Sequence, residues 1–217
     1  MKMLLFLSLI LLISSKIQFF GIDLSYYDET VYWDKLKTQV DFVILRAGYG
    51  TGTTDKVFES YYKKCKQYEI PVGAYWYGHA TTVKGAETEA NAFLERLKGK
   101  KFEYPVYYDM EDKKMLATGM TTVSNMLDKF CSILEGKKYY CGVYSSKSFL
   151  EETFSKKVLS KYDIWLAHYT SQTSYKGHRM WQYTETGKLS GKPGDCDLNY
   201  CYINYPPIIK SNHLNGY

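Results

Sequence analysis

The stretch D-F-V-I-L-R-A-G, residues 41–48, decides the fold. A nearly continuous apolar run of this kind is typical of a strand that is buried on both faces. A helix is predicted next, at 56–68, because its apolar residues recur at helical spacing, and we expect Asp55 to cap it. A second buried run, I-P-V-G-A-Y-W-Y at 70–77, follows that helix. The order strand, helix, strand predicts a parallel pair with its helix outside.

The same alternation continues along the chain. Further strands are predicted at 20–25, 104–110, 139–144 and 164–169, and helices at 31–38, 86–97, from 121 or 122, and at 148–154. The last third becomes β-rich, with strands at 179–184 and 198–203. This order predicts the α/β class, as an irregular TIM-like β/α barrel with a β-rich C-terminal third. The site of such a barrel lies at the C-terminal ends of its strands.

The chain has 217 residues, which suits one domain with a real core. We expect that domain over 20–210 and a frayed tail over 211–217. A basic start, an apolar run from Leu4 to Ile13 and small residues after it predict a signal peptide over 1–19. The run is too short to span a bilayer comfortably. We therefore expect a secreted protein with no membrane segment after cleavage; a signal anchor is the competing interpretation.

Charge and cysteine content narrow the function classes. The net charge is +5, and removing Lys2 and Lys16 with the leader leaves 5 − 2 = +3. The lysines are dispersed, which argues against nucleic acid. Five cysteines exclude complete pairing within one chain, and the pairs nearest in sequence are 131 with 141 and 196 with 201. The four histidines lack zinc-ligand spacing, so we expect no metal or cofactor, and we expect a monomer.

Isolated acids coincide with strand ends. In Y-Y-D-M-E-D, residues 107–112, Asp109 and Glu111 are two apart and should face the same side. Asp23 lies in the first strand, and Asp197 opens the last. Two close carboxylates raise the pKa of one of them, which yields an acid beside a carboxylate, the minimum for cleaving a glycosidic bond. The competing interpretation is a solvated acidic turn, and Asp112 is out of phase and should serve the following loop.

Aromatic residues gather at the same strand ends. Their faces can pack on sugar C–H groups while a phenol bonds hydroxyls. With Gln182, we predict as substrate-binding residues Tyr49, Tyr75, Tyr77, Tyr144, Trp165, Tyr169 and Trp181. Core packing is an equal alternative for Trp165 and Trp181. His168 is either a satisfied strand histidine or a sugar contact.

Several segments together resemble glycoside hydrolase family 25, the Chalaropsis-type lysozymes. They are G-I-D-L-S, F-V-I-L-R-A-G-Y-G, V-G-A-Y-W-Y, P-V-Y-Y-D-M-E-D, G-V-Y-S, I-W-L-A-H-Y and W-Q-Y-T with G-D-C-D-L-N. They follow the family's order over essentially the whole mature chain. The resemblance implies an N-acetylmuramidase acting on bacterial peptidoglycan, for digestion or antibacterial defence.

The resemblance also implies roles for the acids. Glu111 matches the general acid, and Asp109 would hold the substrate's acetamido group or balance an oxocarbenium charge. Asp23 and Asp197 would position Glu111, the sugar or a water. Substrate-assisted retention and water-mediated inversion both stay open, and adjacent Asp109 and Glu111 favour retention. Trp76 stands where the family often has His, which would alter one wall of the site.

Two other functions compete with this interpretation. A non-catalytic wall-binding lectin on the same fold would not need a pair of acids. A chitin-directed hydrolase of the common type would show a D-x-x-D-x-D-x-E run, which this chain lacks.

Overall fold

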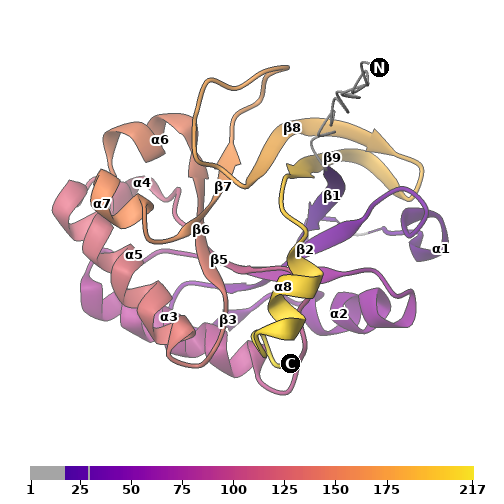
Figure 1. Cartoon of the computed structure of the whole chain (residues 1–217), viewed down its shortest axis with the longest axis horizontal. Coiled ribbons are helices and arrows are strands. Elements are labelled where there is room, and N and C mark those ends of the chain that lie inside the picture. Colours follow the sequence, from indigo (N-terminus) through magenta and orange to yellow (C-terminus); the bar gives the residue numbers. More distant parts are fainter. Residues whose placement is uncertain (1–17, 29) are drawn as a thin grey trace, which may run out of the picture.

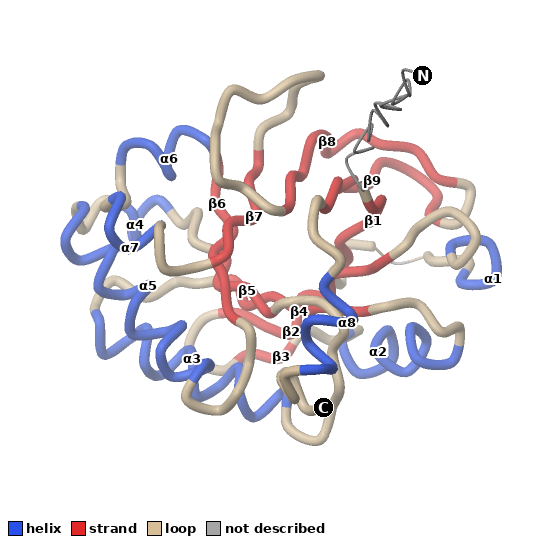
Figure 2. The backbone as a smooth tube through the Cα atoms, in the orientation of Figure 1, coloured by secondary structure: helices blue, strands red, loops and turns tan. Residues whose placement is uncertain are grey.

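The structure is a computed structural model, and it describes residues 18–28 and 30–217. Eight strands close into a barrel (Figure 2). In sheet order they are β1 (Phe19–Leu24), β9 (Lys192–Cys201), β8 (Met180–Leu189), β7 (Asp163–Ala167), β6 (Cys141–Ser146), β5 (Val106–Asp109), β4 (Val72–Tyr77) and β2 (Phe42–Tyr49). β1 pairs with β2 and completes the ring. The predicted α/β barrel with a β-rich last third is therefore confirmed.

The barrel is irregular at one side. β9 runs antiparallel to both of its neighbours, β1 and β8, whereas the other neighbouring strands of the ring are parallel. A short β3 (Thr53–Thr54) adds antiparallel to β2. The β8–β9 hairpin extends along the upper right of the barrel in Figure 1. The hairpin therefore brings residues of the last third to the rim where the parallel strands end.

Strand alternation separates two cores, as β2 shows. Phe42 and Ile44 belong to the core inside the barrel, whereas Val43 and Leu45 face the surrounding helices. A strand with apolar residues on both faces must be covered on both, which explains the continuous apolar run. The next inward position is Arg46, so the alternation that buries this strand also places a cation inside the barrel.

Helices cover much of the outside of the barrel (Figure 1). The larger ones are α2 (Phe58–Gln67), α3 (Val83–Leu97) and α5 (Met120–Glu135), and α3 packs against α5. Short helices are α1 (Trp33–Leu36), α4 (Lys113–Leu116), α6 (Lys147–Glu152), α7 (Lys156–Leu159) and α8 (Tyr205–Ser211). The sequence did not predict β3, α4, α7 and α8. One or two turns of helix carry too little periodicity to be recognised.

Asp55 does not cap α2 as predicted. The N-cap position is Val57, which makes no side-chain cap bond. Asp55 is instead buried, where its Oδ2 accepts hydrogen bonds from Arg46 Nε at 2.8 Å and from the Tyr26 backbone N–H at 3.1 Å. Its other oxygen accepts from the Val57 N–H. The carboxylate ties three segments together, a tertiary role that a local cap pattern cannot reveal.

The tail over 211–217 is not frayed, contrary to the prediction. Asn215 is fully buried. Its amide accepts a hydrogen bond from the Tyr140 N–H at 2.7 Å and donates to the Tyr104 carbonyl at 2.8 Å. Tyr205 and Ile209 of α8 join the inner core at the opposite end from the site. The tail is ordered because it closes the barrel bottom and satisfies backbone groups there.

All five cysteines are free thiols and buried. Cys131 and Cys141 are nevertheless neighbours, with Sγ atoms 2.9 Å apart, while Cys196 and Cys201 lie an odd number of residues apart on β9 and face opposite sides. The predicted leader lies outside the described residues except for its last two, and Phe19 already pairs in β1. Across the described residues, no helix is long and apolar enough to cross a membrane.

Candidate active site

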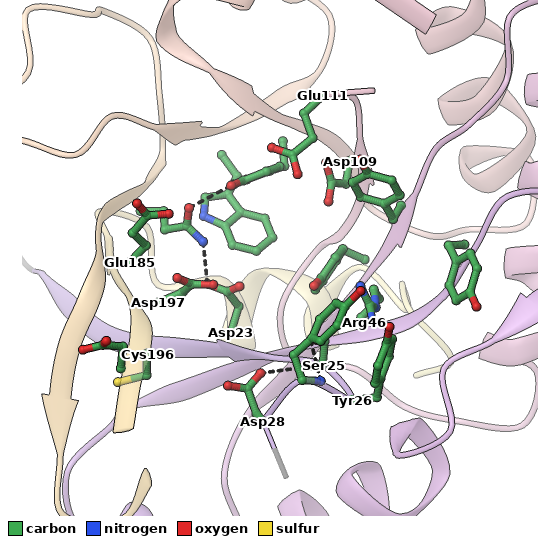
Figure 3. Close-up of a pocket in the computed structure, with 18 of the residues that line it drawn as sticks. Asp23, Ser25, Tyr26, Asp28, Arg46, Asp109, Glu111, Glu185, Cys196 and Asp197 are labelled. Atoms are coloured by element: carbon green, nitrogen blue, oxygen red, sulfur yellow. Dashed lines mark hydrogen bonds between the residues drawn. The ribbon is translucent and has the colours of Figure 1, made fainter. Parts of the chain in front are cut away.

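A cavity of about 680 Å³ opens at the rim where the parallel strands end (Figure 3). All four predicted acids line it. Asp23 comes from β1, Asp109 from the end of β5, Glu111 from the turn that follows, and Asp197 from β9. Residues far apart in the chain thus meet in one acidic cleft, at the end of the barrel that the fold class predicts.

Asp23 and Asp197 are cross-strand neighbours. They are register partners in the antiparallel pair of β1 and β9. Burial and then the charge of Asp197 raise the pKa of Asp23 well above its ordinary value. Burial, followed by the charges of Asp28 and Glu185, raises the pKa of Asp197 to about 7. Both raised pKa values favour the protonated forms of these two carboxyl groups.

Two amides orient Asp23. Gln182 Nε2 and Asn199 Nδ2 both donate to its Oδ2, at 2.9 and 2.8 Å. The amide orientations are themselves determined, because Gln182 Oε1 accepts from the Tyr144 and Tyr169 hydroxyls and Asn199 Oδ1 accepts from Trp165 Nε1. Because the oxygen of each amide already accepts a hydrogen bond from an aromatic residue, its nitrogen is the atom that faces Asp23. The network therefore fixes one oxygen of Asp23 as an acceptor.

Asp109 and Glu111 form the second group of acids. Figure 3 shows their carboxyl groups beside each other at the top of the cleft. The pKa of Asp109 is raised well above its usual range, first by burial and then by the charges of Glu111 and Asp23. Burial, then Glu185, raises the pKa of Glu111. A carboxyl held protonated beside other carboxyls can give its proton to a leaving oxygen.

Arg46 supplies positive charge in the same cleft. Its guanidinium carbon lies 4.7 Å from the ring centroid of Tyr26, 5.1 Å from Tyr27 and 5.7 Å from Tyr49. Together with the ion pair to Asp55, these contacts hold the Arg46 side chain against the three tyrosine rings. The charge of Arg46 acts to lower the pKa of Asp109, although burial and the neighbouring acids outweigh it.

All but one of the predicted substrate-binding residues line the cavity. The cavity is lined by Tyr49, Tyr75, Tyr77, Tyr144, Trp165, Tyr169 and Gln182. Trp181 is the exception: it belongs to the outer core, and its Nε1 donates to the His168 carbonyl at 2.8 Å. Adjacent strand residues point to opposite faces, so Trp181 and Gln182 cannot both enter the barrel. The core alternative is therefore correct for Trp181, whereas Trp165 faces the cleft.

Other lining residues were not predicted. They are Ser25, Tyr26, Tyr27, Asp28, Arg46, His79, Glu185, Asp195 and Cys196. Arg46 could have been found, because it continues the inward alternation of Phe42 and Ile44. Glu185 could not have been found, because the predicted strand ended at 184, one residue before it. In the structure β8 continues to Leu189 and carries Glu185. Asp112 serves the following segment as predicted, because its side chain caps α4 by accepting from the Lys114 and Met115 N–H groups.

Trp76 does not form a wall of the site. It is fully buried in the outer core, and its Nε1 donates to the Gly50 carbonyl at 3.0 Å. The aromatic residues on either side of it on β4, Tyr75 and Tyr77, face the cleft instead. Within 18–28 and 30–217, no group of three or more His, Cys, Asp or Glu side chains is placed to hold a metal ion.

A closed α/β barrel with paired carboxyls in an aromatic cleft is an arrangement typical of glycoside hydrolases. A profile of the family described as Glycosyl hydrolases family 25 matches residues 22–192, and the chain belongs to that family. Among curated proteins it is 25% identical over 185 residues to an autolytic lysozyme of Clostridium acetobutylicum, covering 82% of this chain. The match spans 54% of that relative's length.

Solved structures agree with the family assignment. A family 25 glycosyl hydrolase from Bacillus anthracis superposes with a TM-score of 0.75 at 25% identity, covering 91% of this chain and 93% of that one. The modular autolysin LytC from Streptococcus pneumoniae gives a TM-score of 0.77 at 26% identity, covering 84% of this chain and 46% of the other.

Proposed function

We propose that the protein hydrolyses the β-1,4 bond between N-acetylmuramic acid and N-acetylglucosamine in bacterial peptidoglycan. The observation that carries the proposal is the placement of Asp109 and Glu111 side by side in a cleft that Asp23 and Asp197 also line. The relatives support the substrate class, since one is an autolytic lysozyme and LytC is described in complex with a synthetic peptidoglycan ligand.

In this proposal Glu111 gives its proton to the glycosidic oxygen while the bond to the anomeric carbon breaks. Its raised pKa keeps the proton available. Asp109 steadies the substrate's acetamido group or the oxocarbenium charge. Water then supplies a hydroxyl to the anomeric carbon. Its other proton restores Glu111 in the retaining route, whereas in the inverting route a carboxylate on the opposite face takes it and Glu111 regains its proton from solvent.

Asp23 and Asp197 act as positioning residues in this scheme. The amides of Gln182 and Asn199 hold Asp23 in one orientation, so the pair presents a fixed polar surface to the sugar or to the attacking water. Both the retaining route, in which the acetamido carbonyl attacks first, and the inverting route are compatible with these roles.

We further infer secretion, from the leader predicted over 1–19, and a role in bacterial digestion or antibacterial defence. The protein would act as a monomer and without a cofactor.

The test is incubation of the purified protein with peptidoglycan, followed by identification of the new reducing ends. Wild type should release muramic acid reducing ends, and Glu111→Gln should lower the rate by about 10²–10⁴-fold, the usual contribution of a general acid. Glu95→Gln, which removes an exposed acid on α3 outside both the cleft and its surroundings, is a matched control and should stay close to wild type. Binding without release by the wild type would identify a lectin, and release of glucosamine reducing ends would contradict the proposed bond.

A further inference from the structure

A second hollow of about 460 Å³ adjoins the acidic cleft. Its other walls come from the end of β6, from both ends of α6 and from the segment after β7, and they include Ser146, Lys147, Ser148, Glu151, Glu152 and His168. Glu111 and Tyr169 line both hollows, so they form the boundary between them. In Figure 3 Glu111 stands at one end of the cleft, and Asp28 and Tyr26 stand at the other. A chain whose scissile bond meets Glu111 therefore extends into both hollows.

The acids determine which half of the chain occupies which hollow. Positive charge develops on the sugar ring that is cleaved at its anomeric carbon, whereas the leaving sugar ends neutral once its oxygen is protonated. Asp23, Asp109 and Asp197 line the first hollow and not the second. The acids that line only the second hollow are Glu151, which is paired with Lys147, and Glu152, which is exposed to solvent. Carboxylates stabilise a cationic ring where they surround it. The ring that becomes cationic therefore lies in the first hollow.

We propose that the second hollow binds the leaving half of the polysaccharide, the sugars on the reducing-end side of the scissile bond. The inference rests on the proposed function and adds the direction in which the chain lies. The reducing end points toward α6, and the non-reducing end points past Asp23 toward Tyr26.

The lining of the second hollow suits a neutral sugar. Hydroxyls of Ser146 and Ser148, the ammonium of Lys147 and the ring of His168 offer donors and acceptors. Lys147 is already paired with Glu151 at 2.7 Å, which leaves its charge balanced. Tyr169 is 49% exposed, and its hydroxyl donates a hydrogen bond to Gln182. A half-exposed ring in a fixed orientation is a platform for the C–H face of a sugar.

The test uses linear oligosaccharides of alternating N-acetylmuramic acid and N-acetylglucosamine, labelled at the reducing end. Ser148→Trp fills the hollow from an exposed position on α6. The Ser146 hydroxyl, which accepts from the Phe149 N–H and caps that helix, is left in place. Glu152→Trp fills it from a second exposed position. Ser132→Trp, exposed on α5 and outside both hollows, is the matched control.

Blocking the hollow should move cleavage toward the reducing end, so that labelled fragments become shorter. The rate on long chains should fall about tenfold, which corresponds to about 1.4 kcal/mol of transition-state binding. Longer labelled fragments would reverse the assigned direction. Fragment lengths that match Ser132→Trp in both blocked variants would remove the hollow from the binding site. If the wild type cleaves no chain at all, the proposed function fails, a result distinct from either of these.

Discussion

Asp23 on β1 stands directly opposite Asp197 on β9, so a buried and a half-buried carboxyl group are register partners in one antiparallel pair. Like charges at such positions destabilise a sheet. The cost is limited here because the raised pKa values of both acids favour their neutral forms. Gln182 and Asn199 also donate hydrogen bonds to one oxygen of Asp23. The arrangement therefore lowers the stability of the sheet, and it also raises the pKa values of two acids in the site.

We expect the free energy of unfolding to fall as pH rises from about 4, the ordinary value for an Asp side chain, toward 7. The native pKa of Asp197 is raised, so the native state holds more protons than the unfolded state in this window. The stability that this proton contributes is complete below about pH 4 and is lost as pH rises through the native pKa. Urea unfolding of wild type and Asp197→Asn across this range measures the effect.

The Asp197→Asn curve should be flatter than that of the wild type. Asp195→Asn is the matched control, because Asp195 is on the same strand but exposed and paired with Lys188 at 2.6 Å. Parallel curves for wild type and Asp197→Asn would show that Asp197 does not carry the raised pKa.

Glu185→Gln should move the falling, alkaline side of the pH–kcat profile to lower pH. Removing the negative charge of Glu185 withdraws one cause of the raised pKa of Glu111. Glu111 would then lose its proton at lower pH and cease to act as an acid sooner. Rates on peptidoglycan across the pH range give the comparison, with Glu95→Gln, exposed on α3, as the control for a lost charge. A shift to higher pH would contradict the assigned coupling.

Asn215→Ala should lower the free energy of unfolding by about 3 kcal/mol. The change leaves the half-buried Tyr140 N–H and the buried Tyr104 carbonyl without these partners, and an unsatisfied buried group costs about 1–3 kcal/mol. Asn215 also adopts a φ of 52°, which Asn tolerates better than Ala. Asn212→Ala, an exposed neighbour, should change stability by less than about 0.5 kcal/mol. Equal denaturation midpoints for the two variants would restore the prediction of a frayed tail.

The barrel could be predicted from the sequence because apolar residues recur at the spacing of strands and helices. The apolar run from Phe42 to Leu45 and the helical spacing within α2 each report a local pattern that burial imposes. Asp23, Asp109, Glu111 and Asp197 could be found because an isolated acid at the end of an apolar strand is costly without a purpose. Asp55 and Asn215 were misjudged because their partners lie elsewhere in the chain, so no local pattern records them.

What the sequence by itself determined is the order of strands and helices, the class of the barrel and the identity of its acids. These follow from hydrophobic periodicity and residue type, which act over a few neighbouring positions. Only the tertiary structure decided that Asp23 faces Asp197, that Trp181 turns outward while Gln182 enters the cleft, and that Glu111 divides two hollows. Those relations depend on register and closure between distant strands, where a shift of one residue would exchange every inward side chain for an outward one.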